Sequence, residues 1–169
     1  FGLDLGCEWK GIDFSMFWQG VAKRDLWLDG PMFWGISGGE WQSTGLKEHL
    51  DYYRPENTTS VFGPNTNAYF PKMYMSKDMN QKVQTRYLQN GAYARLKNIQ
   101  LGYTFPTQII NKLHMQKLRV YVSAENVLTI TSLPSGFDPE TTYSSYSDGN
   151  SGKTYPLQTT ISFGLNATF

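Results

Sequence analysis

A strict alternation of apolar and polar side chains runs through Gln158-Thr159-Thr160-Ile161-Ser162-Phe163-Gly164-Leu165-Asn166-Ala167-Thr168-Phe169. Successive side chains of a β-strand point to opposite faces, so a period of two predicts a strand with one apolar face and one polar face. The apolar face carries Thr159, Ile161, Phe163, Leu165, Ala167 and Phe169. A strand of about ten residues with this pattern is typical of a barrel that spans a lipid bilayer.

Four other segments predict strands of the same kind: 1–9, 12–19, 92–105 and 118–125. Lys10-Gly11 is a tight turn between the first two segments. The third alternates cleanly from Asn98 onward, but Arg95 and Lys97 break its parity, which indicates either a bulge or a rise above the membrane. The fold class expected is all-β, with five or so antiparallel strands of a membrane β-barrel.

The connections between these segments alternate in length: 10–11 is short, 21–91 long, 106–116 short and 129–156 long. Outer-membrane barrels have short periplasmic turns and long external loops. An aromatic last residue on the apolar face is also a feature of such proteins. If Phe169 lies at the periplasmic end, both short turns fall in the periplasm and 21–91 and 129–156 are extracellular loops.

The composition narrows the function classes. Lys and Arg total 15 against 14 Asp and Glu, so the basic excess that binds nucleic acid is missing. The single Cys7 excludes an internal disulfide. No apolar run is long enough for a transmembrane helix. A soluble all-β sandwich remains an alternative, since its strands alternate as well.

Four ordered segments resemble one known family. These segments are Ala94–Pro106 (ARLKNIQLGYTFP), Leu118–Leu128 (LRVYVSAENVL), Gly136–Glu140 (GFDPE), and Tyr155–Leu157 followed by Phe163–Phe169 (FGLNATF). The hairpin from Phe1 to Asp25 is similar to the segment upstream of them. Together they resemble the carboxy-terminal part of the SusC/RagA-type TonB-dependent transporters of Bacteroidetes.

The resemblance implies a barrel of about 22 strands with an amino-terminal plug, located in the bacterial outer membrane. It implies active import of glycans or oligopeptides, energised by the TonB complex through the plug and assisted by a SusD-like surface lipoprotein. Residues 1–169 would then be the carboxy-terminal part of the barrel, with the plug and amino-terminal domains absent from this chain. Unpaired strand edges are costly in lipid, so the rest of the barrel is a necessary partner, as is outer-membrane lipid.

The sequence contains no catalytic constellation, metal site or cofactor motif, and an enzyme is not expected. We expect His49 and His114 to be surface residues. Trp27, Trp34 and Trp41 recur in the long loop at intervals of seven. They are candidates for ligand or partner binding, or else form the small core of a folded loop. Phe169 is a candidate assembly signal.

Two other functions stay open. One is a secreted all-β carbohydrate-binding module that uses the loop tryptophans, and the other is a passive porin or structural barrel. Nothing in the sequence separates a glycan substrate from a peptide.

Overall fold

The computed structural model describes residues 1–38, 44–74, 78–142, 152 and 154–169. The chain divides into two compact units. The first, here called the sheet unit, holds residues 1–24, 91–132 and 157–169. The second, here called the loop unit, holds residues 25–90 and 133–156. Each unit is built by residues that are distant in the sequence.

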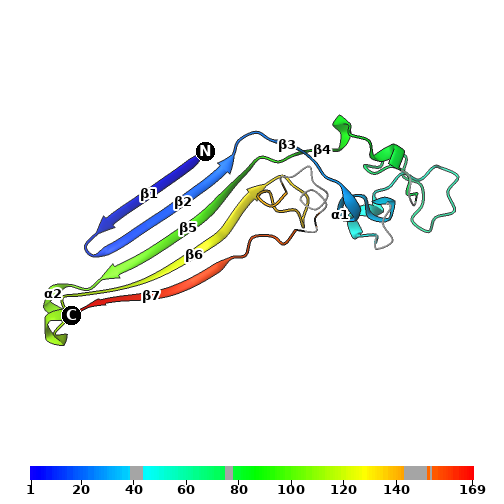
Figure 1. The fold of residues 1–169 in the computed structure, drawn as a ribbon. Coiled ribbons are helices and arrows are strands. Elements are labelled where there is room, and N and C mark those ends of the chain that lie inside the picture. The colour runs from blue at the N-terminus through cyan, green and yellow to red at the C-terminus, as the bar shows by residue number, and fades with distance from the viewer. Residues whose placement is uncertain (39–43, 75–77, 143–151, 153) are drawn as a thin grey trace. The chain divides into compact units, whose positions relative to one another are not determined.

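The sheet unit is a five-stranded antiparallel sheet with its strands in chain order (Figure 1). The strands are β1 (Gly2–Trp9), β2 (Ile12–Val21), β5 (Tyr93–Thr104), β6 (Lys117–Thr131) and β7 (Thr160–Thr168). All five segments with a period of two are strands, which confirms the all-β antiparallel prediction. Among the described residues, β1 and β7 each pair with one neighbour, so each leaves one edge open.

Both short connections lie at the same end of the sheet as the carboxy-terminus (Figure 1). Lys10 and Gly11 have φ values of 48° and 86°, as required by the two-residue hairpin turn that matches strand twist. The connection from 106 to 116 is less simple than the sequence suggests. It contains α2 (Thr107–Ile110) and a 3-10 helix (Asn111–Leu113), and it buries Ile110.

The parity break in the third segment is a bulge. Phe17 of β2 pairs with Asn98, while Trp18 pairs with Leu96, so the register between the two strands skips one position of β5 at Lys97. The register between β5 and β6 shifts at the same place. Extra residues in one strand restore the inward and outward alternation beyond the bulge. The alternative, a rise of the strand above the membrane, is not needed to explain the pattern.

The loop unit combines short elements. A two-stranded ribbon pairs β3 (Asp25–Trp27) with β4 (Leu88–Asn90). The helix α1 (Gly30–Trp34) begins where the Asp29 carboxylate accepts a hydrogen bond from the Gly30 amide. In the described part of the loop unit, four 3-10 helices follow: Gly35–Gly38, Lys47–Leu50, Asp78–Gln81 and Thr85–Tyr87. Strands of three residues are too short to show a period, so the sequence does not predict the ribbon.

An apolar cluster holds the loop unit together. Its buried members are Leu28, Phe33, Trp34, Phe70, Tyr87, Leu133 and Phe137. Leu133 and Phe137 come from the second long connection, whereas the others come from the first. The two connections therefore fold as one body around a shared core. Among the described residues, no helix is long and apolar enough to cross a membrane.

Candidate functional site

One face of the sheet is continuously apolar. Val122 of β6 pairs with Leu101 of β5 and Phe163 of β7, and Val120 pairs in the same way with Tyr103 and Leu165. Directly paired residues point to the same face, so these side chains form a single surface. Phe163 is 84% exposed and Leu165 is 64% exposed. A soluble protein rarely leaves so large an apolar area in water, which indicates that this face contacts an apolar phase.

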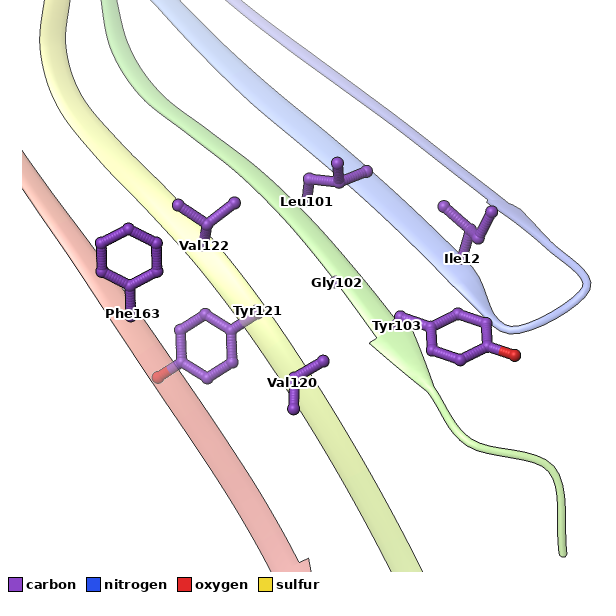
Figure 2. Close-up of a pocket in the computed structure, with 8 residues that line it drawn as sticks. All are labelled: Ile12, Leu101, Gly102, Tyr103, Val120, Tyr121, Val122 and Phe163. Atoms are coloured by element: carbon purple, nitrogen blue, oxygen red, sulfur yellow. The ribbon is translucent and has the colours of Figure 1, made fainter. Parts of the chain in front are cut away.

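A hollow of about 460 Å³ lies on this face (Figure 2). Its apolar side chains come from four strands and include Ile12, Leu101, Val122 and Phe163. None of the lining residues carries a charge. The hollow therefore suits a hydrocarbon chain, and its only polar side-chain groups are the hydroxyls of Tyr103 and Tyr121. It is therefore part of the apolar face of the sheet.

The opposite face carries an ion pair that crosses a strand. The Arg119 guanidinium donates from Nε to Asp13 Oδ1 over 2.9 Å and from Nη2 to Asp13 Oδ2 over 2.5 Å. Arg119 lies on β6 and Asp13 on β2, so the pair passes over β5 between them. It does so at Gly102, where a Cβ atom would lie 2.5 Å from atoms of both side chains. A side chain at this position would therefore displace the pair from its present geometry.

Further contacts on the polar face extend from Arg119 through Tyr121 to β7. Arg119 lies 4.8 Å from the centre of the Tyr121 ring, a cation–π distance. The Tyr121 ring covers Gly164, so a Cβ atom there would overlap the ring. Asp13, Gly102, Tyr121 and Gly164 form one row across four strands. We call Asp13, Arg119 and Tyr121 the polar-face brace.

The period of two in segments 12–19 and 118–125 places Asp13 and Arg119 at polar positions, but it does not pair them. The pattern holds one signal that could have suggested it. Gly102 and Gly164 both fall at polar-face positions of otherwise well-patterned strands, where a missing side chain leaves room for a neighbour to cross. The glycines do not show which side chain crosses, and only the strand register identifies it.

The three loop tryptophans have different surroundings. Trp34 is 1% exposed, and its ring lies 4.9 Å from that of Tyr87 at a steep angle. Its indole is enclosed by the loop unit and presents no face to a ligand, so of the two roles considered it takes that of a core residue. Trp27 is half-buried against the same cluster, 5.9 Å from Trp34. Trp41 lies outside the described residues.

His49 is buried, contrary to the expectation that it lies on the surface. Its Nδ1 accepts a hydrogen bond from the Leu46 amide over 2.9 Å, so Nε2 carries the proton and donates to the Phe33 carbonyl over 3.0 Å. Both ring nitrogens are used to position the loop and have no capacity left for a metal or an acid–base role. His114 is exposed, as expected.

Two hollows of the loop unit adjoin His49, with volumes of about 410 and 540 Å³. Both have the size of a small-molecule pocket. Among the described residues, no group of three or more His, Cys, Asp or Glu side chains could hold a metal ion.

Phe169 follows the last residue of β7 and is 79% exposed. It continues the apolar row of Leu165 and Ala167. Its ring is therefore on the face that contacts the apolar phase, at the end of the sheet that holds the short connections (Figure 1).

Comparisons with known proteins agree with this geometry. No protein-family model matches the chain. The chain is 35% identical to TonB-dependent receptor P3 of Formosa agariphila, an alignment that covers 99% of the chain and 16% of that receptor. It is 25% identical to TonB-dependent receptor P26 of the same organism, over 100% of the chain and 17% of the receptor. The chain thus spans about a sixth of the length of these relatives.

The solved structures that the chain resembles are also transporters. The chain superposes on the RagAB peptide transporter with a TM-score of 0.71 at 27% identity, covering 99% of the chain and 17% of the matched chain. It superposes on the RagAB peptide importer in its open-open state with a TM-score of 0.66 at 26% identity, with the same coverage. All of these proteins are named as receptors, transporters or importers, and none as an enzyme.

Proposed function

Because the chain belongs to the SusC/RagA-type TonB-dependent transporters and matches the carboxy-terminal portion of their barrel, we propose that it forms part of an active importer in the bacterial outer membrane. The five strands supply one sector of the barrel wall. The open edges of β1 and β7 pair with the remaining strands, since an unpaired edge in lipid leaves backbone groups without partners.

The observation that carries this proposal is the division of one sheet into two faces. The apolar face, with Phe163 and Leu165 highly exposed, contacts lipid. The face with the polar-face brace lines the lumen. Both short connections then lie in the periplasm. The long connections from β2 to β5 and from β6 to β7 form the extracellular loops, which between the strand ends comprise residues 22–92 and 132–159 rather than the expected 21–91 and 129–156.

The proposed partners follow from the family. A SusD-like surface lipoprotein delivers glycans or oligopeptides at the extracellular side, and the TonB complex acts through the plug of the whole protein. The solved relatives support a peptide as one substrate class, since they are named as peptide transporters.

Import by the full-length protein tests the proposal. Cells that express it should accumulate labelled oligopeptides or oligosaccharides only when TonB and the proton-motive force are intact. Accumulation that persists without TonB would favour the passive porin instead. A secreted carbohydrate-binding module would need exposed indoles, and Trp34, which is enclosed, does not supply one.

A further inference from the structure

The hollow of about 410 Å³ in the loop unit is bounded by exposed apolar side chains. Ile36, Leu46 and Leu50 are 46%, 37% and 44% exposed, and Phe62 is 58% exposed. These residues gather around one concavity, although they come from separate turns of the loop. A contiguous group of exposed apolar residues is typical of a binding site, whereas single exposed apolar residues are normal on any surface.

The walls of this hollow are fixed by a buried arginine. Arg54 is 8% exposed, and it donates from Nε to the Gly63 carbonyl over 2.6 Å and from Nη1 to the Leu50 carbonyl over 2.7 Å. Its guanidinium also lies 4.6 Å from the ring centre of Tyr52 and 5.9 Å from that of Phe62. One guanidinium thus holds three of the lining residues, so the hollow is preorganised and does not need to form on binding.

The residues that line the hollow carry a positive charge and no negative charge. Of the nine residues around the hollow, all in the described part of the chain, Lys72 is the one with a formal charge. Its ammonium lies 5.3 Å from the ring centre of Tyr74, and no described carboxylate forms a salt bridge with it. His49 also lines the hollow, but both of its nitrogens are engaged with the backbone. The site therefore offers apolar walls and one cation at its rim.

A neutral glycan fits this lining poorly. Each sugar hydroxyl that loses water needs a new hydrogen-bond partner, and the lining adds few polar side-chain atoms beyond those of Tyr52 and Lys72. An apolar group beside a carboxylate fits both features at once. On the basis of the proposed import function, we infer that this hollow binds the carboxy-terminal residue of an oligopeptide, with an apolar side chain inside and the terminal carboxylate on Lys72.

Equilibrium binding to the full-length transporter with its lipoprotein tests this inference. The probes are an N-acetylated oligopeptide that ends in leucine, the same peptide with a carboxy-terminal amide, and maltoheptaose. The free acid should bind up to about fivefold more tightly than the amide, which is the upper range for an exposed ion pair. Lys72→Gln should remove this preference. Lys47→Gln is the matched control, since Lys47 lies in the same unit outside the lining, and it should keep the preference.

Phe62→Ser should weaken both peptides about tenfold, because it removes apolar area from the wall. Equal affinity of acid and amide for the unmodified protein would overturn the inference, as would an equal effect of the two lysine substitutions. Tight maltoheptaose binding that Phe62→Ser weakens and Lys72→Gln does not would replace it with a glycan site.

Failure of this inference is separable from failure of the proposed function, because binding needs no energy and import does. A complex that prefers the acid but shows no TonB-dependent uptake would refute the import function alone. TonB-dependent peptide uptake without any acid preference in binding would refute the carboxylate site alone.

Discussion

Replacing Leu165 with arginine places a charge on the lipid face of β7. Leu165 is 64% exposed and pairs with Val120 on the apolar face. It lies one residue from Gly164, the middle of the nine-residue strand, which is roughly 3 Å along the strand. Ser162 is the control on the other face, since it lies two residues from Gly164 and pairs with Ser123 on the polar face.

The two substitutions should differ widely in cost. Arginine on the lipid face near the bilayer midplane costs about 2–4 kcal/mol in such barrels. That range corresponds to a factor of about 30 to 700 in the folding equilibrium constant. Ser162→Arg leaves its guanidinium in the water of the lumen, and a surface change of this kind should stay within about 0.5 kcal/mol.

The assay is urea unfolding of the full-length barrel in lipid vesicles, together with its yield in the outer membrane. Leu165→Arg should lower the free energy of unfolding by about 2–4 kcal/mol and reduce the yield, whereas Ser162→Arg should match the unmodified protein. Equal losses, or a larger loss for Ser162→Arg, would show that the faces are assigned in the wrong register, because a shift by one residue exchanges them.

Three other predictions address separate parts of the chain. Deleting Phe169 should lower the amount of full-length barrel in the membrane without changing uptake per molecule, and unchanged immunoblot levels would remove its role as an assembly signal. Gly102→Val should separate Asp13 from Arg119 and destabilise the barrel by about 1–3 kcal/mol, as overpacking does; a crystal or cryo-electron-microscopy structure with the pair intact would contradict this. Trp34→Ala should cost the loop unit about 3–5 kcal/mol and speed hydrogen exchange there while the sheet stays protected, so uniform exchange would argue against a separate loop core.

The strands were predictable because their signal is local. A period of two in Gln158–Phe169 depends only on which neighbours share a face, and the structure places β7 within two residues of the expected bounds. The break at Lys97 was visible for the same reason, although the register was needed to identify it as a bulge. Elements without a repeating pattern were harder to predict. The ribbon of β3 and β4 joins residues about sixty positions apart, and neither strand is long enough to show its period.

The polar-face brace was likewise predictable only in part. The sequence placed Asp13, Arg119 and Gly102 on the polar face, but only the register brings the two charges together over the glycine. It also singled out Trp34 without distinguishing a binding residue from a core residue.

By itself, then, the sequence determined the faces of the strands, their order and the alternation of short and long connections, since each is encoded by adjacent residues. The tertiary structure decided the burial of Trp34 and His49 and the hollow beside Phe62 and Lys72. Burial depends on which distant segments close around a side chain, and no local pattern in an irregular loop specifies that closure.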